Sequence, residues 1–187
     1  MNKSELRKKY KQRRSQLSET KIDALSFEIS NTLLKLDIWE YSFYHMFLTI
    51  EEYKEVNTNY LLSILSGKDK NIVVSKSDFA TGLMTHFLLT DNTTLKKNAF
   101  NIPEPTDGIE IDSSKMDVIF IPLLAFDKQG SRVGYGKGFY DKFLSNCKPG
   151  TIKVGLSFFE AEELIYDISE HDIKLDYCVT PKEFIAF

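Results

Sequence analysis

Cysteine is scarce in this sequence, and long hydrophobic runs are missing. Cys147 and Cys178 are its 2 cysteines, too few and too far apart for a disulfide framework or a zinc site of four thiolates. The charged N-terminal stretch is not followed by the apolar segment of a secretion signal, and no segment approaches the roughly 18 apolar residues of a membrane span. We therefore expect a cytoplasmic protein with reduced thiols and no membrane partner.

An excess of positive charge is also missing. The chain has 24 Lys and Arg against 27 Asp and Glu, with a net charge of −3 and a pI near 5.7, whereas nucleic-acid-binding proteins usually carry a basic field. His45, His86 and His171 show no metal-ligand spacing and have no neighbouring nucleophile, so we assign them no catalytic role. We predict that both cysteines are packing residues, and that nucleic acid is not a partner.

Hydrophobic residues make up 42% of the 187 residues, which is enough for one core, and no repeat or linker divides the chain. We therefore predict a single domain over residues 1–187. Basic and apolar stripes at helical spacing predict an amphipathic helix over residues 3–17, and the basic stripe contains Lys3, Arg7, Lys11 and Arg14. A second amphipathic helix is predicted to follow Ser18.

Short apolar runs later in the chain predict strands at 43–50, 72–74, 87–89, 118–126 and 152–159. Helical patterns at 60–65 and 138–144 lie between some of them. Near-continuous apolar runs are typical of strands that are covered on both faces. We therefore expect an α/β fold, a three-layer α/β/α sandwich with a mostly parallel central sheet.

The most informative segment is 121–144, IPLLAFDKQGSRVGYGKGFYDKFL, in which a predicted strand leads through a glycine-rich turn to a predicted helix. Its glycines let backbone N–H groups approach an anion, and a helix N-terminus favours negative charge. Arg132 and Lys137 add a forked donor and a point charge. The spacing is neither a Walker A motif nor a dinucleotide GxGxxG. It favours a phosphate site, with a plain flexible turn as the alternative.

This segment resembles the signature of the 5-formyltetrahydrofolate cyclo-ligase family, approximately PxLAFDxxGxRxGxGxGYYD. The matching residues are Pro122, Leu124, Ala125, Phe126, Asp127, Gly130, Arg132, Gly134, Gly136, Gly138, Tyr140 and Asp141. Further matches near residues 3–7, at 101–105 (NIPEP) and at 171–176 (HDIKLD) extend the resemblance over nearly the whole chain. The chain departs from the family at Phe139, where Tyr is usual, at Ser75, where Pro is common, and at 49–54, which is slightly longer than usual.

The resemblance implies an enzyme that uses ATP and Mg²⁺ to convert 5-formyltetrahydrofolate to 5,10-methenyltetrahydrofolate, and an N-terminal helix that closes on the nucleotide site. The implied ATP-binding residues are Lys3, Ser4, Glu5, Leu6, Arg7, Arg132, Val133, Gly134, Tyr135, Gly136, Lys137, Gly138, Phe139 and Tyr140. The implied folate-binding residues are Leu48, Glu55, Phe100, Tyr135 and Phe139. Arg132 and Lys137 are the implied catalytic residues, and Asp141 and Asp176 are the implied magnesium ligands.

Simpler interpretations of the same residues stay open. The basic helix fits a solvated charged face, Glu55 fits a helix start, and Asp141 and Asp176 fit a helix cap and a strand end. The alternative functions are a non-catalytic nucleotide or phosphate sensor and an RNA-binding protein. We expect a monomer. We also expect the replacement of Arg132 or Lys137 by Ala to spare folding, because long basic side chains around an anion site are seldom part of a core.

Overall fold

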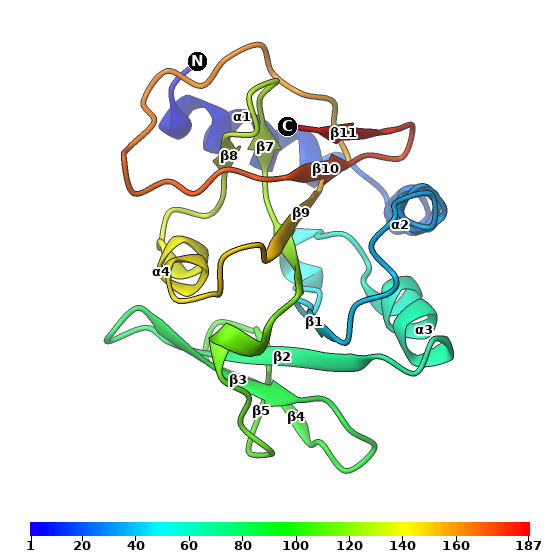
Figure 1. The fold of residues 1–187 in the computed structure, drawn as a ribbon. Coiled ribbons are helices and arrows are strands. Elements are labelled where there is room, and N and C mark those ends of the chain that lie inside the picture. Colours follow the sequence, from blue (N-terminus) through cyan, green and yellow to red (C-terminus); the bar gives the residue numbers. More distant parts are fainter.

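A seven-stranded sheet is the centre of the computed structural model, which describes residues 1–187 (Figure 1). Its strands lie in the order β11-β10-β9-β6-β1-β2-β3. All neighbouring pairs are parallel except β2 with β3 and β10 with β11, at the two edges. The strands span β1 (Phe43–His45), β2 (Asn71–Asp78), β3 (Leu83–Leu88), β6 (Val118–Pro122), β9 (Ile152–Leu156), β10 (Tyr177–Val179) and β11 (Phe184–Ala186).

The four helices confirm the helical patterns of the sequence, and the caps explain where the first two begin. α1 (Lys3–Ser15) begins at a capping box, in which Asn2 and Glu5 each accept a hydrogen bond from the other's backbone N–H. α2 (Glu19–Leu33) begins after Ser18, whose hydroxyl accepts from the Lys21 N–H. The others are α3 (Asn59–Gly67) and α4 (Phe139–Ser145), with the short 3₁₀ turns η1 (Glu51–Tyr53) and η2 (Ser113–Lys115).

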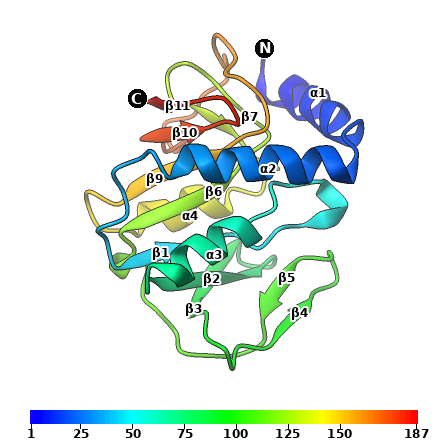
Figure 2. The ribbon, with the colours of Figure 1, turned by 90° about the vertical axis from the view of Figure 1, so that its right-hand side faces the viewer.

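Both faces of the sheet are covered, which confirms the predicted three-layer arrangement. Along β6, Val118 and Phe120 pack in the cluster that includes the apolar residues of α2 and α3. Ile119 and Ile121 pack in the opposite cluster with Phe143 of α4. Because successive side chains of a strand point to opposite faces, this alternation places β6 between two cores. Figure 2 shows α2 and α3 on one side of the sheet and α4 behind it.

Helix α1 is held by a small third cluster rather than by the main sheet. Leu6 and Tyr10 are buried against Leu124 and Val133, which lie in and beside the hairpin of β7 (Ala125–Phe126) and β8 (Arg132–Val133). The hairpin immediately precedes the glycine loop. Docking α1 here therefore brings its basic stripe to that loop.

The strands are shorter and more numerous than the apolar runs suggested. β1 ends at His45, and the remaining apolar residues of its run, including Met46 and Ile50, are buried in an irregular segment. β10, β11 and the small hairpin of β4 (Leu95–Lys97) and β5 (Pro103–Pro105) were not predicted, because three residues are too few for a periodic signal. No helix in residues 1–187 is both long and apolar enough to traverse a bilayer.

Candidate active site

A cavity of about 720 Å³ opens where the parallel strands β1 and β6 end. Phe47 and Leu48, just after β1, line it on one side, and Pro122 and Leu124, at and after the end of β6, line it on another. The chain leaves β1 toward β2 and later leaves β6 toward β9, in the opposite direction along the sheet. Ligand sites of open α/β sheets form at such a reversal of strand order.

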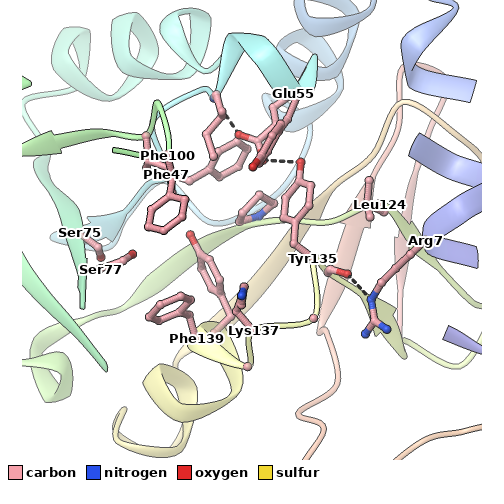
Figure 3. Close-up of a pocket in the computed structure, with 18 of the residues that line it drawn as sticks. Arg7, Phe47, Glu55, Ser75, Ser77, Phe100, Leu124, Tyr135, Lys137 and Phe139 are labelled. Atoms are coloured by element: carbon pink, nitrogen blue, oxygen red, sulfur yellow. Dashed lines mark hydrogen bonds between the residues drawn. The ribbon is translucent and has the colours of Figure 1, made fainter. Parts of the chain in front are cut away.

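The glycine loop forms one wall of this cavity (Figure 3). Gly136 and Gly138 have φ values of 94° and 71°, a backbone region that residues with a side chain rarely adopt. A side chain at Gly136 would also come within 3.2 Å of the Arg7 guanidinium. Arg7 in turn donates from Nε to the carbonyl oxygen of Gly134 at 3.0 Å. The loop therefore needs glycine both for its backbone path and for the close approach of α1.

Cationic side chains from α1 and the loop meet at this end of the cavity. Lys3, Arg7 and Lys11 lie at intervals of four residues along α1, and all three line the cavity. Lys3 pairs with Asp172. Lys137 is exposed, lines the same space and has no hydrogen-bond partner within the protein. Its ammonium group is therefore free to bind an anion.

Arg132 lines the cavity, but its guanidinium is already engaged by the protein. Its side chain is 7% exposed, pairs with Asp141 Oδ1 at 2.6 Å through Nη2 and donates through Nη1 to the carbonyl oxygen of Ile173. These contacts argue against the expectation that Arg132→Ala would spare folding, because that change leaves Asp141 without its charged partner. Lys137 still fits the expectation.

Of the two aspartates proposed as metal ligands, only Asp141 faces the cavity. Its Oδ1 accepts from Arg132 and from the Ile173 N–H at 3.1 Å, and its Oδ2 has no partner within the protein. Asp176 does not line the cavity, which corrects our expectation that folding brings it beside the loop. Its carboxylate instead accepts from the Lys153 N–H at 2.7 Å and pairs with the Lys153 ammonium, at the start of β9. Asp172 takes its place in the cavity wall.

The opposite end of the cavity contains a buried carboxylate, Glu55. Its Oε2 accepts from the Ile50 N–H at 2.9 Å, and its Oε1 accepts from the Tyr135 hydroxyl at 2.7 Å (Figure 3). Burial raises the pKa of Glu55, while the nearby positive charge of Arg14 lowers it. Burial also raises the pKa of Tyr135, so this phenol stays protonated and remains a donor.

Aromatic rings line the space next to Glu55. Phe79 lies 4.3 Å from Phe100 and 5.1 Å from Phe139 between ring centroids, and Phe47 and Tyr140 line the same cavity. Phe100 is 51% exposed although it is a large apolar residue. A set of rings with open faces suits a flat heteroaromatic ligand.

The structure brings together most of the residues named from the sequence. The ones that line the cavity are Lys3, Arg7, Leu48, Glu55, Phe100, Arg132, Gly134, Tyr135, Gly136, Lys137, Gly138, Phe139, Tyr140 and Asp141. Ser4, Glu5, Leu6 and Val133 do not line it: Leu6 and Val133 are core residues, and Glu5 completes the helix cap. Four further lining residues were not named as site residues from the sequence: Arg14, Phe47, Phe79 and Asp172. Arg14 belongs to the predicted basic stripe and Asp172 to the matching segment 171–176, so each had a signal nearby.

Comparisons with known proteins agree on one family. Residues 1–181 match the model of the 5-formyltetrahydrofolate cyclo-ligase family. The 5-formyltetrahydrofolate cyclo-ligase of Mus musculus is 31% identical over 70% of this chain and 69% of its own length, and a probable cyclo-ligase of Schizosaccharomyces pombe is 26% identical over 99% and 98%. The solved structure of Aquifex aeolicus 5,10-methenyltetrahydrofolate synthetase is 30% identical, with a TM-score of 0.84 over 100% of this chain and 93% of that one. This chain therefore belongs to the 5-formyltetrahydrofolate cyclo-ligase family and is an ATP-dependent ligase of one-carbon metabolism.

Proposed function

We propose that this cavity binds ATP and 5-formyltetrahydrofolate side by side and closes the folate ring there, releasing ADP and phosphate. One observation carries the placement: a single cavity has a cationic glycine loop at one end and a buried carboxylate among aromatic rings at the other. The first end suits a triphosphate. The second suits a pterin, because the two oxygens of a carboxylate can accept hydrogen bonds from the pterin's amino group and a ring N–H together.

The reaction needs an activated oxygen because an amide oxygen is a poor leaving group. The formyl oxygen attacks the γ-phosphorus of ATP, the bond to the bridging oxygen breaks, and ADP leaves. The folate N10 then attacks the formyl carbon and loses its proton, and the oxygen departs with the phosphate. Phosphoryl transfer of this kind depends on alignment and charge stabilisation more than on covalent chemistry.

The residues of this chain are suited to those tasks. Lys137, Lys3 and Arg7 supply positive charge to the phosphates, and the loop N–H groups supply directed donors. Arg132 and Asp141 hold each other, so Arg132 fixes one side of the cavity while its charge stays near the transferring group. Glu55 and Phe139 orient the folate from the other end.

We assign the magnesium ion of this reaction to Asp141, whose Oδ2 is free of protein partners. Magnesium keeps several waters and needs only one or two protein carboxylates beside phosphate oxygens, so this one oxygen fits it. When bound, the ion offsets the charge of the triphosphate. Asp172 is the second carboxylate of the cavity wall, although it is paired with Lys3. The monomeric state and the cytoplasmic location stay predictions from the sequence.

The experiment that tests the function is an absorbance assay for the methenyl product. The purified protein should form it from 5-formyltetrahydrofolate only when ATP and a divalent cation are present, with one ADP released for each product. A non-catalytic nucleotide-binding module would bind ATP without product. ADP release without cyclisation, while the folate is bound, would contradict the proposed reaction and leave the nucleotide site intact.

A further inference from the structure

Arg14 is a buried arginine that the proposed reaction leaves without a role. It lies in the last turn of α1, is 4% exposed and lines the cavity. Its Nη2 donates to the carbonyl oxygen of Leu123 at 2.6 Å, and its Nη1 donates to the Tyr135 hydroxyl at 2.8 Å. Its Nε has no partner. A buried guanidinium with an unmatched donor is costly for stability alone, which favours a role in the site.

The hydrogen bond from Arg14 to Tyr135 determines the direction of the hydrogen bond between Tyr135 and Glu55. A guanidinium can only donate, so Tyr135 must accept from Arg14. The single hydroxyl hydrogen of Tyr135 is then directed to its other neighbour, Oε1 of Glu55, at 2.7 Å. With the Ile50 N–H on Oε2, both oxygens of Glu55 are fixed by donors.

A second contact ties the Glu55 segment to the same helix. Lys54, which has a φ of 49°, donates from Nζ to the carbonyl oxygens of Ser15 and Leu17 at 2.8 and 2.6 Å, at and just beyond the end of α1. The end of α1 therefore fixes the backbone beside Glu55 and, through Tyr135, its side chain. Lys3 and Arg7 of this helix lie at the phosphate end.

We propose that Arg14 is a positioning residue for the folate: through Tyr135 it orients the Glu55 carboxylate, so that docking of α1 couples the nucleotide end of the cavity to the folate end. This inference rests on the proposed folate-binding role of Glu55. Other charged or titratable groups also face this chain of contacts. Tyr140 of α4 is near Glu55, Lys11 and Tyr53 lie against the Tyr135 ring, and the Lys54 ammonium is directed to the end of α1. Glu52 lines the same cavity. Arg14 is the charge that opposes the effect of burial on the pKa of Glu55.

The test is the pH dependence of kcat/KM for 5-formyltetrahydrofolate in Arg14→Gln and Arg14→Lys. Without Arg14, no arginine charge opposes the effect of burial, so the pKa of Glu55 rises further. The ionised form of Glu55, and with it activity, should then recover only at higher pH. Arg14→Gln should lower kcat/KM at pH 7 by roughly 10- to 100-fold, the scale of one lost charge-assisted hydrogen bond, and shift the ascending limb of the profile to higher pH. Arg14→Lys should restore part of both.

Arg13→Gln is the matched control. Arg13 lies over the rings of Tyr10 and Phe159, away from the cavity, so its loss should leave the profile in place. In a Glu55→Gln background, Arg14→Gln should cause no further loss, because the two residues act through one chain of contacts. Additive losses, or an unshifted profile in a folded Arg14→Gln protein, overturn the proposal. A wild-type protein that makes no methenyl product would instead overturn the proposed function itself.

Discussion

Lys137→Ala and Arg132→Ala should both slow cyclisation, but only one should destabilise the fold. Each removes a positive charge beside the proposed path of the phosphoryl group, and losing one preorganised donor lowers turnover by roughly 10²–10³. Lys137 has no partner in the protein, so its loss should change the free energy of unfolding by less than about 0.5 kcal/mol. The structural cost should therefore fall on Arg132.

The cost at Arg132 follows from its surroundings. Its side chain is 7% exposed and its ion-pair partner Asp141 is 31% exposed, so the remaining carboxylate regains only part of its hydration. The expected loss is about 2–4 kcal/mol, between a lost charged hydrogen bond and a broken buried ion pair. For a chain of this size that corresponds to a fall in Tm of roughly 5–15 °C.

The assay pairs methenyl absorbance at saturating ATP with thermal unfolding followed by circular dichroism. Turnover is measured well below the lower Tm, so that both variants are folded. Arg132→Lys, which keeps the charge, should recover stability better than turnover, because Lys cannot contact Asp141 and the Ile173 carbonyl oxygen in one fork. A Lys137→Ala protein with near-normal turnover would remove Lys137 from the mechanism. An unchanged Tm in Arg132→Ala would refute the reasoning from burial.

The remaining predictions concern the metal, the N-terminal helix and a buried histidine. Asp141→Asn should raise the magnesium concentration needed for half-maximal activity. Asp176→Asn should lower Tm slightly and leave that magnesium concentration unchanged. If both variants need the same magnesium concentration, the metal assignment is contradicted. Leu6→Ala should destabilise by roughly 2–4 kcal/mol in denaturant unfolding, because Leu6 is the fully buried residue that packs α1 against Leu124 and Val133. Burial lowers the pKa of His86 to about 4, so stability should fall between pH 6.5 and about 4 as the unfolded chain takes up the proton. A His86→Gln protein should show a shallower fall, and an unchanged slope would contradict this.

The parts of the fold that repeat a pattern could be predicted from the sequence. The stripes of α1 and α2 fit the helical period, and the run of β6 alternates between two cores, as a strand covered on both faces requires. β10 and β11 could not be predicted in this way, because each has three residues; β10 also depends on pairing with β9, which is distant in sequence, and β11 pairs only with β10. Long-range pairing leaves no local period to detect.

The site residues also differ in whether local sequence or long-range contacts bring them together. The glycine loop and its bordering residues are contiguous, so their chemistry was visible in one segment. Asp172 and Asp176 differ by four positions, and the sequence favoured Asp176, whereas Asp172 is the one that lines the cavity. Asp176 is bound to Lys153 at the start of β9, while Asp172 pairs with Lys3. Arg14 was visible only as one member of a basic stripe. Its contact with Tyr135 spans 121 positions and exists only once α1 docks.

The charge of the cavity differs in sign from that of the whole protein. The chain has a net charge of −3, yet the cavity is lined by Lys3, Arg7, Lys11, Arg14, Lys54, Arg132 and Lys137 against Glu52, Glu55, Asp141 and Asp172. Both proposed substrates are anions, one through its triphosphate and the other through its glutamate carboxylates. A cationic cleft in an acidic protein concentrates such ligands at one place and repels them from the remaining surface. Several of these cations lie on α1, so anion binding also offsets repulsion within the docked helix. A ligand that binds only the docked form stabilises it by mass action, so we predict that substrate binding favours docking of the N-terminal helix.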